Sequence, residues 1–298
     1  MRKRRLPLEG GQLLWYTDGK GGKIAMNALQ PRPRIAWALG GGGVRGFAHL
    51  GVLKVLQEEE IPVDALAGTS MGAVMAALFA AGTDLKYLAA LAARIAWEEF
   101  VDLRFPRYGL VEGKRLLPLI RLLTKRKKLE ELGLPVRIVA TDLLTGEEVV
   151  FSQGPLELAL RASISIPGVF TPVPYGEHLL VDGGLVAGVP VKAATAMGTD
   201  LVFAVYVPGK LVAEPPRSVF DILYRSSEIM MHQLDGIQLK QADFILVPEV
   251  GDVGTLQFSR VEECIKKGEA AARKALPALR RIIAEFQTDW GKAAGDRI

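Results

Sequence analysis

The 298-residue sequence contains one cysteine, Cys264, and only three histidines. A single cysteine excludes a disulfide framework within the chain. Histidine, cysteine and carboxylate residues form no group at the spacing of metal ligands, so we expect neither a metal nor another cofactor. The sequence also lacks internal repeats and low-complexity segments, and its 49% hydrophobic content excludes a disordered or collagen-like chain.

Positive charge is unevenly distributed along the chain. The net charge is +4, but residues 1 to 34 contain eight basic and two acidic residues, so residues 35 to 298 carry a net charge of −2. We expect a flexible basic arm over residues 1–34, one domain over residues 35–290 and a tail over residues 291–298.

Because the body has no excess of positive charge, we expect no nucleic-acid partner. The arm lacks the continuous apolar segment of a secretory signal, which favours a cytoplasmic protein. The oligomeric state is left open.

An uncharged segment of 19 residues, Ala65–Thr83, has nearly the length of a membrane span. Within it, however, a helical pattern covers only Met71–Ala81, which corresponds to roughly 16 Å at 1.5 Å per residue. That length is about half of the hydrocarbon thickness of a bilayer. The segment is therefore interpreted as a buried strand, a turn and a helix.

Short apolar runs alternate with helical periodicity along the rest of the chain. This alternation predicts an α/β fold with a mainly parallel central sheet and helices on both faces. The predicted strands cover residues 35–39, 63–67, 136–141, 148–152, 179–182, 201–207 and 244–247. The predicted helices cover residues 46–59, 71–81, 85–100, 113–123, 156–163, 191–197, 219–241 and 261–286.

A glycine-rich loop, residues 40–46, joins the first predicted strand to the first predicted helix. It reads Gly-Gly-Gly-Gly-Val-Arg-Gly, and a backbone without side chains lets several N–H groups approach one oxyanion or phosphate. Gly41, Gly43 and Gly46 also match the dinucleotide pattern G-x-G-x-x-G, which needs an acidic residue about 20 positions later, at the end of the next strand. The acid in that region, Asp64, lies at the other end of the strand. The loop alone favours neither interpretation strongly.

A second loop, residues 68–72, has the pattern G-x-S-x-G. Gly68 and Gly72 flank Ser70 at the point where a predicted strand gives way to a predicted helix. This is the context of a nucleophile elbow, in which the two glycines relieve crowding around a strained serine. The pattern therefore indicates Ser70 as a candidate nucleophile.

A serine hydroxyl is a weak nucleophile unless a neighbouring base accepts its proton. The chain has three histidines, His49, His178 and His232. None of them lies on a predicted loop that suits a base. Asp182 ends the predicted strand 179–182 and is followed by Gly183 and Gly184. An acid at this place can point into a crevice, although Asp-Gly alone is typical of a solvated turn. Asp182 is thus the better candidate for the base.

The chain resembles the patatin-like phospholipase family over residues 35 to 283. The resemblance rests on the loops at residues 40–46, 68–72 and 182–184, in that order. Residues 141–146 and 161–168 add two further motifs to the resemblance. It implies a serine acyl hydrolase with a Ser-Asp dyad, in which Ser70 is the nucleophile and Asp182 the base. It also implies an oxyanion hole built from the N–H groups of Gly41, Gly42 and Gly43. The residues that would support these loops are Arg45, Gly46, Gly68, Gly72, Gly183 and Gly184.

The resemblance implies a lipid ester as substrate, either a phospholipid or a lysophospholipid. One departure concerns Ala187 and Gly188, where family members often carry an asparagine pair. Apolar helical patterns over residues 84–105 and 219–241 suggest peripheral contact with an anionic membrane surface, although such patterns are also typical of a core. A basic cluster could meet the headgroups: Arg121, Lys125, Arg126, Lys127 and Lys128.

Two other interpretations stay open. The chain could be a nucleotide-binding module that uses the Gly40–Gly46 loop. It could also be a catalytically silent lipid-binding or regulatory protein of the same fold.

Overall fold

The structure is a computed structural model, and it describes residues 5–7, 13–15, 32–94, 115–210, 215–216 and 218–295. The chain divides into two units, residues 1–32 with 285–298, and residues 33–284. In the first unit, β1 (Arg5–Pro7) pairs antiparallel with β2 (Leu13–Trp15). Most of the predicted basic arm lies outside the described residues, so its flexibility stays a prediction. The second unit contains the sheet and the predicted site.

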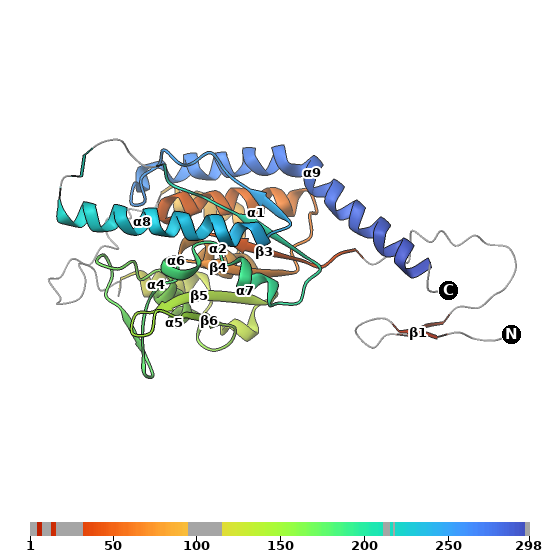
Figure 1. The fold of residues 1–298 in the computed structure, drawn as a ribbon, viewed down its shortest axis with the longest axis horizontal. Helices are drawn as coiled ribbons and strands as arrows, with labels where there is room; N and C mark the ends of the chain where they lie inside the picture. Colours follow the sequence, from red (N-terminus) through yellow and green to blue (C-terminus); the bar gives the residue numbers. More distant parts are fainter. Residues whose placement is uncertain are drawn as a thin grey trace, which may run out of the picture. The chain divides into compact units, whose positions relative to one another are not determined.

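Within the described residues, the central sheet has eight strands in the order β10-β9-β3-β4-β5-β8-β7, with β6 also paired to β5. Figure 1 labels β3, β4, β5 and β6 of this sheet. The pairs from β10 to β5 are parallel, whereas β6, β7 and β8 are attached by antiparallel pairing. This confirms the predicted mainly parallel α/β sheet. The strands are β3 (Ile35–Leu39), β4 (Ala65–Thr69), β5 (Val136–Asp142), β6 (Glu148–Phe151), β7 (Val173–Tyr175), β8 (His178–Asp182), β9 (Leu201–Val205) and β10 (Phe244–Leu246).

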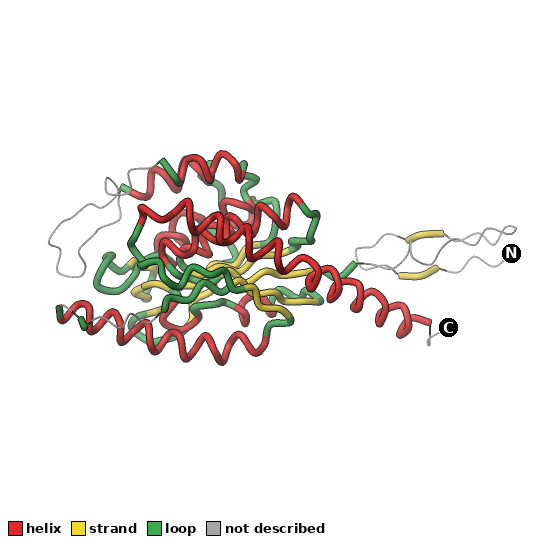
Figure 2. Tube along the Cα trace, turned by 90° about the horizontal axis from the view of Figure 1, so that it is seen from above, coloured by secondary structure: helices red, strands yellow, loops and turns green. Residues whose placement is uncertain are grey.

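Helices cover both faces of the sheet, as Figure 2 shows from above. The described helices are α1 (Ala48–Glu58), α2 (Met71–Ala80), α3 (Leu85–Ala92), α4 (Leu116–Leu123), α5 (Leu156–Ser163), α6 (Gly184–Ala187), α7 (Val191–Thr195), α8 (Val219–Gln238) and α9 (Val261–Gly295). Short 3-10 turns cover Gly43–Phe47, Leu129–Glu131, Leu239–Gln241 and Phe258–Arg260. None of the helices that the structure describes is both long and apolar enough to cross a membrane.

The two faces of the sheet carry side chains of different size. Alternate residues of β3 and β4, Ala36, Ala38, Ala65 and Ala67, belong to a buried cluster with residues of α7. Because these side chains are small, the short helix α7 contacts β3, β4 and β9 directly. The intervening residues of β3, Ile35, Trp37 and Leu39, have larger side chains. Trp37 packs its ring edge-on against another buried aromatic ring from β9.

The strands that carry the predicted dyad share one edge of β5. β4 pairs with the first part of β5, where Thr69 lies opposite Val139. β8 pairs with the next residues of β5, where Asp182 lies opposite Ala140. β6 pairs with residues 138–141 along the opposite edge of β5. β4 and β8 must therefore both lie along the first edge, where they meet end to end. Ser70, which directly follows β4, is therefore brought next to Asp182.

Several predicted boundaries differ from the structure. β4 begins at Ala65 rather than at residue 63, and the three-residue strand β7, which contains Pro174, was too short to be recognised from its pattern. The first helix starts as a 3-10 turn at Gly43 before α1 begins at Ala48. The predicted helix over residues 85–100 is described as α3 to Ala92, and residues 95–100 lie outside the described residues.

Candidate active site

Ser70 lies in a strained turn between β4 and α2. Its φ is 54° and its ψ is −124°, a conformation that costs a non-glycine residue about 1–3 kcal/mol. A Cβ on Gly68 would lie 2.4 Å from the Ala73 Cα atom, and a Cβ on Gly72 would lie 2.2 Å from the Leu39 carbonyl oxygen. Both glycines are therefore required by close packing, as the elbow pattern predicts.

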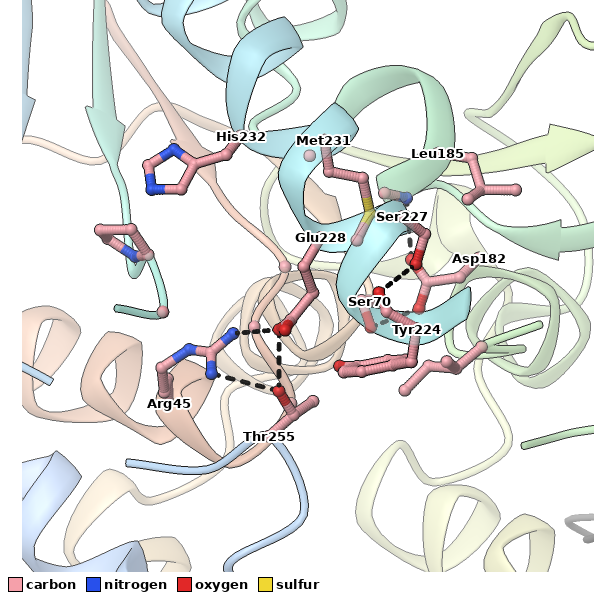
Figure 3. A pocket seen from close by; sticks show the side chains of 18 of the residues that line it. Arg45, Ser70, Asp182, Leu185, Tyr224, Ser227, Glu228, Met231, His232 and Thr255 are labelled. Carbon is pink, nitrogen blue, oxygen red and sulfur yellow. Dashed lines mark hydrogen bonds and ion pairs between the residues drawn. The ribbon is translucent and has the colours of Figure 1, made fainter. Parts of the chain in front are cut away.

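The Ser70 hydroxyl donates a hydrogen bond of 2.6 Å to Oδ2 of Asp182 (Figure 3). The other carboxylate oxygen, Oδ1, accepts a bond of 2.8 Å from the Gly184 N–H. The Asp182 backbone is also held, since its carbonyl accepts from the Thr141 hydroxyl at 2.9 Å. A Cβ on Gly183 would lie 2.4 Å from the Val139 carbonyl oxygen. The two glycines after Asp182 thus allow its close approach to β5 and fix its carboxylate.

Burial raises the pKa of Asp182 to about 6, against the opposing effect of its hydrogen bonds from Ser70 and Gly184. Asp182 is 7% exposed and Ser70 is 6% exposed. At neutral pH the carboxylate is mostly ionised, and it is more basic than an ordinary aspartate. This combination suits a general base that accepts the Ser70 proton.

Ser163, at the end of α5, holds the backbone of the elbow. Its hydroxyl accepts a hydrogen bond of 2.8 Å from the Ser70 N–H and donates one of 2.6 Å to the Val139 carbonyl. The residue is fully buried. The motif over residues 161–168 belongs to the family resemblance, but it assigns no role to Ser163. The available signal was a serine at the end of the predicted helix over residues 156–163.

The glycine loop faces the same pocket as Ser70, but its amides are not equivalent. The Gly41 N–H donates to the Gly188 carbonyl at 2.8 Å, and the Val44 N–H donates to the Thr255 carbonyl at 2.9 Å. The N–H groups of Gly42 and Gly43 have no acceptor among the residues that the structure describes. Two of the three predicted oxyanion donors are thus available, whereas the Gly41 N–H is engaged in holding the loop.

Arg45 anchors the glycine loop to three other segments. Its guanidinium donates to the Val207 carbonyl at 3.3 Å, the Val253 carbonyl at 3.1 Å and the Thr255 hydroxyl at 3.1 Å. It also forms an ion pair of 3.4 Å with Glu228 on α8 (Figure 3). Gly46 is required beside it, because a Cβ there would lie 2.5 Å from the Met71 Cβ atom. Arg45 therefore connects the loop with the wall of the pocket.

No histidine contacts the Ser70–Asp182 pair in the described part of the chain. His49 is buried beneath the loop with Nε2 2.7 Å from the Gly40 carbonyl oxygen, and burial lowers its pKa to about 4. His178 Nδ1 lies 2.8 Å from Asp142. His232 lines the pocket, but its Nδ1 lies 2.6 Å from the Tyr206 hydroxyl.

The pocket above the dyad has a volume of about 340 Å³. Its walls combine the glycine loop and the dyad with apolar side chains from three segments: Ile166, Leu185, Leu223 and Met231. Ala187 and Gly188, which stand where family members often carry asparagine, leave the Ser70–Asp182 hydrogen bond in place. Within the described ranges, no three His, Cys, Asp or Glu side chains lie close enough together to hold a metal ion.

The predicted basic cluster lies in the last turn of α4 and in the turn that follows it. Arg121 forms an ion pair with Glu157 on α5. Lys125, Arg126 and Lys128 are exposed in the turn after the helix, and Lys127 is half-buried. The cluster is thus partly neutralised and partly available to solvent.

The patatin-like phospholipase family model matches residues 38–195. An uncharacterized NTE family protein of Mycobacterium tuberculosis is 39% identical over 180 residues, which cover 59% of this chain and 50% of that protein. A rat patatin-like phospholipase domain-containing protein 7 is 36% identical over 183 residues, which cover 58% of this chain and 13% of that protein. The chain spans about half the length of the mycobacterial relative. The crystal structure of VipD from Legionella pneumophila shares the fold, with a TM-score of 0.57 at 16% identity over 93% of this chain and 70% of that chain.

Proposed function

Because this chain belongs to the patatin-like phospholipase family, whose model matches residues 38–195, we propose that it is a serine hydrolase of lipid carboxylic esters. The observation that carries the proposal is the 2.6 Å hydrogen bond from the Ser70 hydroxyl, in a strained elbow, to the buried Asp182 carboxylate. The expected substrate is a phospholipid or a lysophospholipid.

In the proposed reaction, Asp182 takes the proton of the Ser70 hydroxyl while the oxygen attacks the ester carbonyl. The N–H groups of Gly42 and Gly43 stabilise the oxyanion, because both residues line the pocket and neither N–H has an acceptor among the described residues. One such donor contributes about 3 kcal/mol in a hydrolase of known energetics. The alcohol leaves with the proton from Asp182. Water then attacks the acyl-enzyme with Asp182 again as base, which releases the fatty acid and restores Ser70.

A fluorophosphonate probe and a soluble short-chain ester test this function. The wild type is expected to label at Ser70 and to hydrolyse the ester, while Ser70→Ala does neither. Asp182→Asn should lose hydrolysis, whereas His232→Ala should retain it, because His232 contacts neither member of the dyad. A wild type that neither labels nor hydrolyses would favour a nucleotide-binding or catalytically silent protein. Activity kept in Asp182→Asn but lost in His232→Ala would indicate a histidine base instead.

The outer face of α8 supports a proposal about where the substrate enters. Among the described side chains of this helix, seven large apolar ones are exposed, and at 100° per residue they fall within an uncharged arc of about 140°. They are Val219, Ile222, Leu223, Ile229, Met230, Leu234 and Ile237. Leu223 also lines the pocket, so the apolar stripe continues into the pocket mouth. We propose that this stripe rests on the acyl chains of a lipid surface and that the substrate passes along Leu223 to Ser70.

Flotation with vesicles that contain anionic phospholipid tests this contact. The double variant Met230→Gln and Ile237→Gln is expected to lose vesicle binding and vesicle hydrolysis but to keep its kcat/KM for the soluble ester. A matched control places the same substitution at Leu143 and Leu144, two exposed residues after β5. Unchanged flotation of the α8 variant would contradict the proposal. So would a wild-type dimer that the variant converts to monomer in light scattering, since the stripe would then join two copies.

A further inference from the structure

A buried acid on α8 has no part in the reaction described so far. Asp235 is 7% exposed and lines the same pocket as the dyad. Its Oδ1 is buried without a hydrogen-bond partner within the described ranges. Burial raises the pKa of this carboxyl to about 6, with the charge of His232 and hydrogen bonds from Val189 and Tyr206 opposing the rise. A group so costly to bury requires a specific reason for its place.

The carboxyl group of Asp235 fills the space where a side chain at position 188 would lie. A Cβ on Gly188 would be 2.3 Å from Asp235 Oδ1 and 2.9 Å from both Cγ and Oδ2. The backbone of Gly188 has φ −59° and ψ −41°, which any residue adopts. Glycine is therefore needed at this position for the room it leaves, not for its conformational freedom.

The peptide group between Gly188 and Val189 has neighbours at both ends. Its N–H, on Val189, lies close enough to the Asp235 carboxyl group to oppose the rise in the pKa of that group. Its carbonyl, on Gly188, accepts the 2.8 Å hydrogen bond from the Gly41 N–H. A charged acceptor on the N–H side polarises the peptide group and strengthens the bond that its carbonyl accepts. The Asp235 carboxylate, which packs against Gly188, is thus connected to the glycine loop through this one peptide group.

We propose that Asp235 is a positioning residue for catalysis, which acts through the Gly188–Val189 peptide group to hold Gly41. With the Gly41 amide bonded to Gly188, the amides of Gly42 and Gly43, two residues that line the pocket, stay available for the oxyanion. Asp182 thus orients the nucleophile on one side of the substrate, and Asp235 orients the oxyanion donors on the other. This inference rests on the proposed hydrolase function.

The test compares steady-state hydrolysis of a soluble short-chain ester at pH 8, where Asp235 is ionised. Asp235→Ala is expected to lower kcat about 10- to 100-fold with little change in KM, because misplaced oxyanion donors affect the transition state more than binding. Asp235→Asn keeps an acceptor for the Val189 N–H and should restore most of the lost kcat. Melting temperatures show whether each variant is folded.

The matched control is Gln238→Ala, one turn further along α8. The Gln238 side chain donates to the Val186 carbonyl at 2.7 Å, so it also fastens α8 to α6, but it does not touch the 188–189 peptide group. It is expected to retain the wild-type kcat. An equal loss of kcat in Gln238→Ala and Asp235→Ala would overturn the inference, because the effect would then come from docking of α8.

A paired substitution tests the route through Gly188. Gly188→Ala should displace the carboxylate and lower kcat by itself, but in the Asp235→Ala background it should cost nothing further, because the space is then open. Additive losses in the double variant, or a wild-type kcat in Asp235→Ala, would refute the inference while the hydrolase function stands. A wild type without hydrolysis would instead refute the proposed function.

Discussion

Replacing Asp182 by asparagine is expected to stabilise the fold at alkaline pH while it abolishes hydrolysis. Burial raises the pKa of Asp182 from 3.8 to about 6, so the folded protein keeps this proton at pH values where the unfolded chain has lost it. Between about pH 4 and pH 6 the folded state therefore binds more protons, and the free energy of unfolding falls as the pH rises. Above that window the ionised carboxylate destabilises the fold.

The size of this effect follows from the shift of about two pKa units. Each unit corresponds to about 1.4 kcal/mol, so the ionised Asp182 costs about 3 kcal/mol of stability at pH 8 relative to its protonated form. An asparagine has no proton to lose, and its amide can still accept from the Gly184 N–H. Asp182→Asn should therefore match the wild type near pH 4 and exceed it by up to about 3 kcal/mol at pH 8.

Urea denaturation at several pH values between 4 and 8 measures the difference. Asp235, whose pKa is also raised to about 6, is present in both proteins, so its contribution largely cancels. Ser70→Ala is the control, because it is also inactive but keeps the Asp182 carboxylate and removes a hydrogen bond that lowers its pKa. We expect it to be less stable than the wild type at pH 8. Parallel loss of stability in Asp182→Asn and the wild type between pH 4 and 8 would refute the reasoning.

Three further outcomes are expected. Ser163→Ala leaves two buried backbone groups without partners, so urea denaturation should show a loss of about 2–4 kcal/mol; a loss below about 1 kcal/mol would contradict this. The kcat/KM for a soluble ester should rise with pH through about 6 as Asp182 becomes an ionised base, and a flat profile between pH 5 and 7 would argue against that assignment. Arg45→Lys should lower kcat about 10-fold, because a lysine cannot replace the three carbonyl and hydroxyl contacts together with the Glu228 ion pair; a wild-type kcat would show that the loop needs no such anchor.

The nucleophile elbow was predictable from sequence because it depends on the local geometry of one short segment. Gly68 and Gly72 are required by close contacts within the strand-turn-helix unit and with the adjacent loop. The sequence shows this requirement as the pattern G-x-S-x-G. The parallel sheet was likewise predictable, since buried strands and amphipathic helices have characteristic periods. The uncharged segment that resembled a membrane span is β4, the elbow and α2.

The glycine loop marks the limit of such local reasoning. Its glycines indicated an anion site, but the pattern made Gly41, Gly42 and Gly43 equivalent. Only the approach of Gly188, far along the chain, distinguishes the Gly41 amide from the other two. The role of Ser163 was not predictable for the same reason, because its two hydrogen-bond partners, on β5 and at Ser70, come from other parts of the chain.

The sequence by itself determined the α/β class, the strained position of Ser70 and the glycines around both loops, because these are properties of short segments and of their periodicity. The tertiary structure decided which groups meet. The end-to-end arrangement of β4 and β8 on one edge of β5 brings Ser70 to Asp182, and the packing of α8 on α6 brings Asp235 to Gly188. Register and helix packing depend on complementary surfaces that lie far apart in the chain, and no single segment contains that information.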